Sequence, residues 1–257
     1  MDPSAELVAS MCAQDEPLVL DRALLLIAAT LRDDPGIVGS GLAHLDRLAE
    51  SCTEHTVDGV VRHLFDGLGF AGDTDDYHNP ENSMLDRVLD RRRGMPITLA
   101  AVMIETGRRL DVGLDGVGMP GHFLVRDRTD PERFLDPYAG GVTRDRGECM
   151  ARFDSIHGGK AAFDERFLDP VATRSVVTRV LNNLTASLRI RDPQRLDCLL
   201  ALRVQLTMAP PELRALAELC EGRGRYDDAA RLLDRLAVAT DTDAAAEHAS
   251  RLRARMN

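Results

Sequence analysis

The segment RRRGMPITLAAVMIETGRRLD (residues 91–111) combines a glycine, a proline and a nearly all-apolar helix. The proline, Pro96, stands at the first helical position, where the missing N–H does no harm. A cysteine at such a helix N-terminus has a lowered pKa and forms a thiolate, which is a nucleophile. Here the first turn contains Pro96, Ile97 and Thr98, with neither a cysteine nor a serine. The segment therefore has the place for a nucleophile but not the usual residue.

Two other candidates for chemistry follow this helix, namely His122 in PGHFLV and Asp136 in FLDPY. The stretches GVGMPGHFLVRDR and RFLDPY predict two strands joined around DRTDPE. Residues paired across a hairpin have a constant sum of residue numbers, so two even-numbered residues share a face when the loop is odd in length. We predict a turn centred on Asp130, with both side chains facing the N-terminus of the Pro96 helix. Alternatively, both residues satisfy local backbone groups.

Two further side chains are conceivable nucleophiles, Thr98 and Cys149. A buried helical threonine usually bonds back to a carbonyl group, and a lone helical cysteine is usually part of the core. The five cysteines lack CxxC spacing, which favours neither a metal site nor a disulfide framework and fits a reducing compartment. They are Cys12, Cys52, Cys149, Cys198 and Cys220.

The polar stretch AGDTDDYHNPENS (residues 71–83) contains three aspartates and a histidine, but its spacing does not match an EF-hand. We therefore interpret it as a turn-rich loop with no metal, and we expect Asn82 to cap the next helix, SMLDRVLDRRR. The three arginines ending that helix fit a helix C-terminus, or else they hold an anion or an acidic partner. Arg92, Arg93 and Asn82 are the candidate binding residues.

The composition is that of a soluble globular protein, with 44% hydrophobic and 29% charged residues. Aromatic residues make up only 4%, so the core is expected to be built from aliphatic side chains, which favours helices. The formal net charge of −10 argues against nucleic acid as a partner. The longest apolar run, ALLLIAA, is too short to cross a membrane, and no signal peptide is recognisable. We expect a cytoplasmic protein without a cofactor.

The order of predicted elements divides the chain into three parts. Residues 1–70 read as helices, residues 71–165 contain the apolar helix and the strands, and residues 166–257 return to helices separated at DP, APP and GRG. In the last part, PPELRALAELCEGRGRYDDAARLLDRLAVAT resembles one tetratricopeptide unit and predicts a packed helical hairpin. The expected fold class is α+β and mostly helical.

Longer segments of the chain resemble the SirB-type branch of the transglutaminase-like superfamily. The resemblance is carried by LAHLDRLAE, LFDGLGFAGDTDDYHNPENSMLDRVLDRRRGMPITLA, PGHFLV and FLDPYAGG. It implies a papain- or transglutaminase-like core, with a buried central helix against a small antiparallel sheet, followed by tetratricopeptide-like helices. It also implies that His122 is the general base and that Asp136 orients it, whereas the position of the catalytic cysteine is occupied by Pro96.

Three functions remain open. The missing cysteine favours a non-catalytic module that binds a protein or peptide and has a regulatory role. The alternative is an acyl-transfer enzyme or amide hydrolase that uses the His122–Asp136 pair with Thr98, Cys149 or an activated water. The third is a structural adaptor whose charged surface selects its partner.

Overall fold

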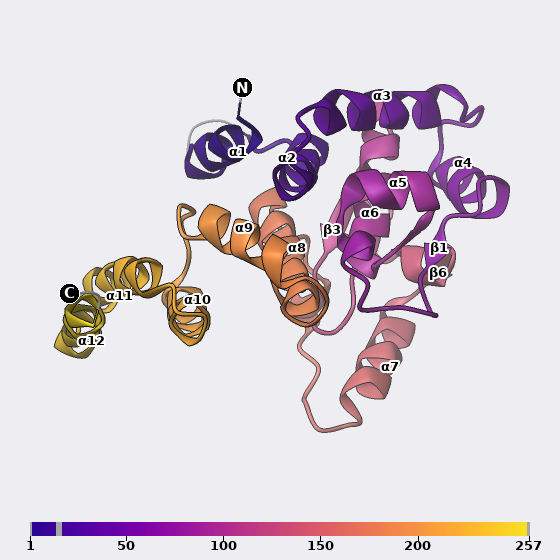
Figure 1. Cartoon of the computed structure of the whole chain (residues 1–257). Coiled ribbons are helices and arrows are strands. Elements are labelled where there is room, and N and C mark those ends of the chain that lie inside the picture. Colours follow the sequence, from indigo (N-terminus) through magenta and orange to yellow (C-terminus); the bar gives the residue numbers. More distant parts are fainter. Residues whose placement is uncertain (1, 14–16, 256–257) are drawn as a thin grey trace.

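The computed structural model describes residues 2–13 and 17–255, and these residues form a mostly helical α+β fold (Figure 1). The predicted fold class is confirmed. A small antiparallel sheet packs beside a group of helices, and further helices extend away from it towards the C-terminus. No helix within the described residues is long and apolar enough to cross a membrane.

Helices of the first half of the chain surround the central helix α6, whereas α9 to α12 form an arm that leads away from the sheet (Figure 1). Their bounds are α1 Pro3–Cys12, α2 Leu20–Arg32, α3 Gly36–Glu50, α4 Val57–Val61, α5 Leu85–Arg91, α6 Pro96–Arg109, α7 Arg146–His157, α8 Thr173–Arg191, α9 Pro193–Arg203, α10 Pro210–Gly222, α11 Tyr226–Thr240 and α12 Asp243–Ala254. Shorter turns are the π-helical Arg62–Gly67 and the 3₁₀ turns Pro80–Ser83, Pro137–Ala139 and Glu165–Leu168.

The main sheet has four antiparallel strands in the order β3-β4-β5-β6, so each strand pairs with its neighbour in sequence. A separate two-stranded parallel pair joins β1 to β2. The strands are β1 Ala71–Gly72, β2 Arg93–Gly94, β3 Leu114–Val117, β4 Leu124–Asp127, β5 Phe134–Asp136 and β6 Val142–Arg144. In this meander, short turns place residues of consecutive strands side by side.

Helix α6 lies in the middle of the core, between helices α2, α3 and α5 on one side and strands β3 and β4 on the other. Eleven of its fourteen residues are buried, because its sequence has no polar face to turn towards water. Pro96 occupies its first position, as predicted. The N-terminus of α6 is consequently placed inside the protein.

The C-terminal end of α6 is bound to α2 by buried charges. Asp21 Oδ2 accepts hydrogen bonds from Arg108 at 3.1 Å and Arg109 at 2.7 Å. Glu105 Oε2 accepts from the same two arginines at 2.7 and 3.1 Å. Burial raises the pKa of both carboxyl groups, but hydrogen bonding and charge from Arg109 outweigh it at Asp21, whose net pKa is lowered. At Glu105 burial and the Asp21 charge prevail, so its pKa is raised.

The C-terminal helices follow the predicted breaks. Helix α8 covers residues 173–191, close to the predicted run, and α9 begins at Pro193 directly after the Asp-Pro break. Helices α10 and α11 pack against each other through buried leucines and alanines across the short turn at residues 223–225. The predicted hairpin is therefore formed, whereas its assignment as a tetratricopeptide unit stays a prediction.

Two local predictions are wrong. Asn82 does not cap α5, because the residue before that helix is Met84 and it makes no side-chain cap. Asn79 instead caps the preceding 3₁₀ turn by accepting from the N–H of Glu81 at 3.0 Å. The stretch GVGMPGHFLVRDR is not one strand but two, β3 and β4, which pair with each other. The turn that separates them contains Pro120 and Gly121, and Gly121 has a positive φ of 77°.

We predict that Gly72→Ala destabilises the protein by about 1–3 kcal/mol through overpacking. A Cβ on Gly72 would lie 2.5 Å from the ring of Tyr138, which is itself half-buried, so the ring would have to move. The free energy of unfolding is measured by urea denaturation. The control is Gly39→Ala at an exposed position of helix α3, where a Cβ meets nothing within 4 Å. Alanine has the higher helix propensity, so this variant is expected to be more stable than wild type by up to about 1 kcal/mol. Equal stability of the two variants would contradict the prediction.

Candidate functional site

His122 and Asp136 come together in the structure. His122 Nε2 lies 2.9 Å from Asp136 Oδ1, and the two side chains are only 3% and 1% exposed. The pairing of Val125 with Leu135 centres the β4–β5 turn on Asp130, as the sequence predicts. This register puts the two even-numbered residues on one face. Their catalytic role stays a prediction, but their geometry is that of an oriented histidine.

The tight turn before β4 positions His122. The sequence predicts His122 to lie in a strand, but it precedes β4, which begins at Leu124. The N–H of His122 donates to the carbonyl of Met119 at 3.0 Å across Pro120 and Gly121. A Cβ on Gly121 would lie 2.6 Å from the Ile156 side chain, which is too close. The left-handed backbone conformation of Gly121 also disfavours any other residue. The chain can therefore pass close to α7 only with a glycine at this position.

Arg179 of α8 holds this turn from the other side. Its guanidinium donates to the carbonyl of Met119 at 3.1 Å and to that of His122 at 2.8 Å. The same group lies 5.5 Å from the centre of the Phe123 ring. Burial lowers the pKa of Arg179, and Tyr77 opposes that effect. The sequence does not single out Arg179, because nothing in a long helical run indicates which arginine contacts the His122 turn, 57 residues earlier.

Asp136 is held by more than the histidine. Its Oδ1 also accepts from the N–H of Ala139 at 3.2 Å, and its Oδ2 accepts from Arg144 Nε at 3.1 Å. Burial by itself raises the pKa of Asp136, but the hydrogen bonds and charges of His122 and Arg144 outweigh it, so the net pKa is lowered. The carboxylate is consequently ionised at neutral pH.

Arg144 is the second residue that sequence analysis missed. It pairs with Phe134 across β5 and β6, two residues from Asp136 and on the same face of the sheet. The available signal was the pair Gly140 and Gly141, both with positive φ, which returns the chain into β6. Recognising that return as a hairpin would have placed Arg144 diagonally opposite Asp136.

Two tyrosines pack around the histidine. The Tyr138 ring meets His122 edge-on with 6.3 Å between ring centres, and Tyr77 meets Tyr138 at 5.9 Å. The hydroxyl of Tyr138 donates to the carbonyl of Asp73 at 3.0 Å. Burial raises the pKa of both tyrosines. The polar loop thus packs against the histidine through two neutral aromatic rings.

A small cavity of about 140 Å³ joins the start of α6 to the histidine. Both Pro96 and His122 line it, as the resemblance implies for the nucleophile position and the base. The remaining lining residues are Tyr77, Met95, Ile97, Gly121, Phe123, Arg179 and Asn183. The second ring nitrogen of His122, Nδ1, has no hydrogen-bond partner among the described residues. The lining residues include no thiol and no aliphatic hydroxyl.

Thr98 does not line this cavity, and its hydroxyl is engaged elsewhere. The Thr98 Oγ1 donates to the carbonyl of Asn82 at 2.6 Å and accepts from the N–H of Met95 at 3.1 Å. The side chain is completely buried. The hydroxyl therefore caps α6 and ties it to the segment before α5.

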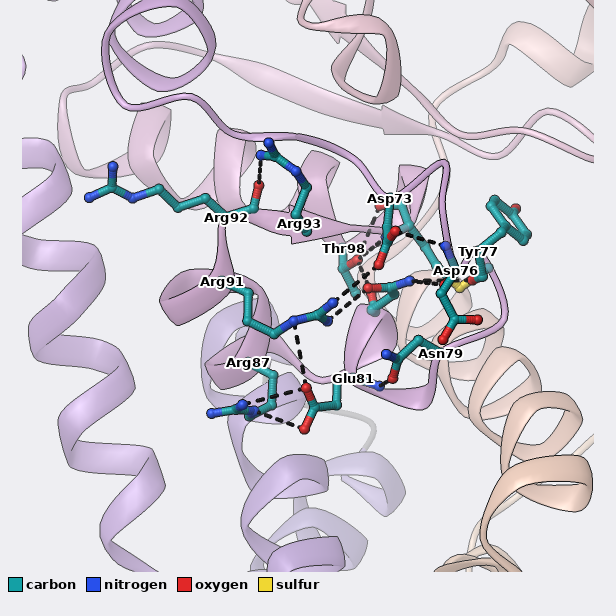
Figure 2. Close-up of polar contacts among 12 residues, drawn as sticks. Asp73, Asp76, Tyr77, Asn79, Glu81, Arg87, Arg91, Arg92, Arg93 and Thr98 are labelled. Atoms are coloured by element: carbon teal, nitrogen blue, oxygen red, sulfur yellow. Dashed lines mark hydrogen bonds and ion pairs between the residues drawn. The ribbon is translucent and has the colours of Figure 1, made fainter.

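Asn82 and Arg91 organise the loop beside the site. Figure 2 shows Arg91 pointing towards Asp73 and Glu81. Asn82 is fully buried; its amide donates to the carbonyl of Asp76 at 2.8 Å and its Oδ1 accepts from Arg91 at 2.9 Å. Arg91 also donates to Asp73 Oδ2 at 3.1 Å, and Glu81 lies 3.6 Å from Arg91 Nε. Every polar atom of the Asn82 side chain is used within the protein, so the structure gives it a folding role in place of the predicted cap.

The next two arginines point away from this loop network. Arg92 has a positive φ of 56°, ends α5, and donates to the carbonyl of Leu68 at 2.8 Å. Arg93 donates to the carbonyl of Gly69 at 2.8 Å. Both are exposed and neither forms an ion pair among residues 2–13 and 17–255. They satisfy carbonyl groups at a helix end, and their charges remain available to an anion.

Cys149 lies in an apolar cluster with Phe134 and Phe153 and is fully buried. Burial raises its pKa to about 11, against a smaller opposing effect of Arg144. The thiol is therefore protonated at neutral pH and behaves as a small apolar side chain. Within the described part of the chain, no group of three or more histidine, cysteine or acidic side chains is placed to hold a metal ion.

Comparison with known proteins places this chain in a family. Residues 39–182 match the profile of the transglutaminase-like superfamily, so the chain belongs to that superfamily. A UPF0162 protein of Xylella fastidiosa is 38% identical over 187 residues, covering 66% of this chain and 65% of the relative. A UPF0162 protein of Pseudomonas aeruginosa is 32% identical over 185 residues, covering 67% of this chain and 66% of the relative. The chain thus spans just under two thirds of the length of these relatives.

A shorter match reaches a eukaryotic protein. F-box only protein 21 of Homo sapiens is 41% identical over 63 residues, which are 24% of this chain and 10% of that protein. No solved structure matches the chain.

We predict that Thr98→Val destabilises the protein by about 1–2 kcal/mol, because the buried Asn82 carbonyl loses a hydrogen bond. Urea unfolding followed by circular dichroism measures the change. Thr240→Val is the matched control, since that hydroxyl bonds back to Leu236 near the end of α11 and is expected to matter by less than about 0.5 kcal/mol. A loss no larger than that of the control would refute the structural role of Thr98.

We predict that Asp136→Asn lowers the free energy of unfolding by an amount on the order of 2 kcal/mol at pH 7. Because the pKa of Asp136 is lowered in the folded state, its charge stabilises the fold above the unfolded pKa of about 4. That stabilisation is lost as the pH falls through the folded pKa. The free energy of unfolding is measured at pH 7, 5, 4 and 3, and the difference between variant and wild type should shrink below pH 4. The control is Asp66→Asn, which removes one exposed carboxylate and so reports the effect of the change in net charge alone. A difference independent of pH would count against the charged pair.

Proposed function

We propose that this protein is a non-catalytic member of the transglutaminase-like superfamily, of the SirB-type branch, that binds a protein or peptide. The observation that carries the proposal is the cavity beside His122, where Pro96 stands at the position of the nucleophile. Proline has no atom that can attack a carbonyl carbon. The site therefore has the orienting pair of an acyl-transfer enzyme without the group it would activate.

The other candidate nucleophiles support the same reading. The Thr98 hydroxyl donates its proton to the Asn82 carbonyl, away from the cavity. The thiol of Cys149 has a pKa of about 11 and lies in an apolar cluster. Neither side chain is among those lining the cavity. A covalent acyl intermediate would consequently have no attachment point at the site.

The cavity supports binding of a small polar group. His122, Arg179 and Asn183 all line it, and each carries hydrogen-bonding groups. Its volume of about 140 Å³ is that of a single side chain or a chain end, not of a whole ligand. We infer that a peptide inserts one such group there while the rest of it lies on the surface.

A second function is favoured by the histidine itself. His122 is oriented by Asp136 at 2.9 Å, and its Nδ1 is free of protein partners among the described residues. Nδ1 could act as a general base that accepts a proton from a water in the cavity, and this water would attack the substrate directly. Such a hydrolase needs no covalent intermediate. This reading makes the protein a hydrolase of activated esters or amides.

The two functions are separated by covalent labelling at pH 7 with a chloroacetamide for thiols and a fluorophosphonate for hydroxyls. We expect labelling only at the exposed Cys12 and Cys198, at the same rate in wild type and in His122→Ala. The Cys12→Ser/Cys198→Ser variant then serves as the silent background. Stoichiometric labelling of that background, lost in His122→Ala, would sink the non-catalytic proposal.

The hydrolase alternative is tested with the same variants on a panel of p-nitrophenyl esters and peptide anilides. Turnover above the buffer rate that disappears in His122→Ala supports it. Turnover at the buffer rate in every variant removes it and leaves the binding function.

A further inference from the structure

We propose that the groove between α8 and α10 binds an acidic peptide segment of a partner protein. The inference rests on the proposed binding function but concerns a second surface, which shares only Arg179 with the lining of the His122 cavity. It depends on the shape of the groove, on its uncompensated positive charge and on its apolar wall.

The groove consists of two adjoining open cavities of about 760 and 470 Å³. They share Asn182 of α8 and Glu212 of α10, so they form one continuous depression between these helices. Its lining runs along α8 from Arg174 to Arg189, roughly 22 Å at the rise of an α-helix. That length accommodates about seven residues of an extended peptide.

Positive charge dominates the lining. Arg174, Arg179, Arg189 and Arg203 all line the groove, and Glu212 is the one carboxylate among the lining residues. None of the four arginines forms an ion pair within the described part of the chain. Arg174 donates to the carbonyl of Ala13 at 3.0 Å, and the contacts of Arg179 are also to carbonyl groups. Their charges are therefore not neutralised by the protein.

Arg203 is the buried member of this set. Only 5% of it is exposed, and its guanidinium donates to Thr185 Oγ1 at 2.6 Å and to Asn182 Oδ1 at 2.7 Å. Glu212 favours this buried charge only at longer range, without forming an ion pair with it. Both hydrogen-bonding partners are neutral, so the charge lacks a counterion in direct contact. An incoming carboxylate would supply one. Elsewhere in this chain a partly buried arginine such as Arg109 has carboxylate partners from its own fold.

The α10 side of the groove is apolar, with Ala215, Leu216 and Leu219 in the lining. A peptide with apolar side chains between acidic ones would meet both walls. Nucleic acid fits less well, because the chain carries a formal net charge of −10 and an apolar wall offers nothing to a phosphate backbone. The charge contrast between the groove and the rest of the chain points to an acidic peptide.

The test uses the full chain and a fluorescein-labelled eight-residue peptide of alternating glutamate and leucine, with binding measured by fluorescence anisotropy. The comparison peptide has lysine in place of glutamate. We expect the acidic peptide to bind at least about tenfold more tightly than the basic one, with affinity falling as salt is added. Arg189→Glu and Arg174→Glu should each weaken binding about tenfold.

Arg47→Glu is the matched control, because Arg47 is exposed on α3, far from the groove in sequence, and the substitution changes net charge by the same amount. It should leave binding unchanged, and circular dichroism confirms that each variant is folded. Equal affinity for the two peptides, an equal loss in Arg47→Glu, or tighter binding of a single-stranded oligonucleotide would each overturn the proposal. Neither Arg174 nor Arg189 lines the His122 cavity, so failure here leaves the labelling and turnover tests of that cavity intact.

Discussion

The fold depends on anchoring both ends of helix α6, whose buried N-terminus leaves backbone groups that must find partners inside the protein. At the N-terminus, the hydroxyl of Thr98 and the N–H of Met95 both bind the carbonyl of Asn82. At the C-terminus, Arg108 and Arg109 bind carboxylates of α2 and of α6 itself. These contacts fix α6 along its axis, and its first residue consequently faces the cavity at His122.

That cavity is shaped by segments from three distant parts of the chain. Tyr138 packs on the histidine and on the loop before α5, whereas Arg179 holds the turn that carries the histidine. Helix α8 belongs to the C-terminal part by composition, yet its contacts make it a wall of the core. The end of the matched family region at residue 182, within α8, agrees with this arrangement. A ligand that contacts Arg179 therefore lies within one side chain of the histidine turn.

Local signals in the sequence account for much of this structure. The apolar helix starting at Pro96, the long helix α8 and the turn centred on Asp130 follow from periodicity, breaker residues and strand parity. The assignment of one long strand through His122 failed, because apolar residues on both sides of a Pro-Gly turn look alike in sequence. Arg144 was missed because the Gly140–Gly141 return was not recognised as a hairpin, although the signal was local. Arg179 was missed because its partners are set by tertiary contacts, which no local pattern encodes.

The presence of an oriented histidine without a nucleophile has a physical explanation that needs no chemistry. Removing one member of a buried charged pair typically costs about 3–5 kcal/mol, whereas replacing the whole group by apolar residues can be neutral. Asp136 satisfies His122, Arg144 and the N–H of Ala139 at once, so no single substitution can dismantle the group cheaply. The His122–Asp136 pair therefore stabilises the core whether or not it takes part in catalysis. The core does not account for the other ring nitrogen, Nδ1, which has no partner in the described residues and faces the cavity that a ligand group or a water would enter. Which of the two fills that cavity decides between binding and hydrolysis.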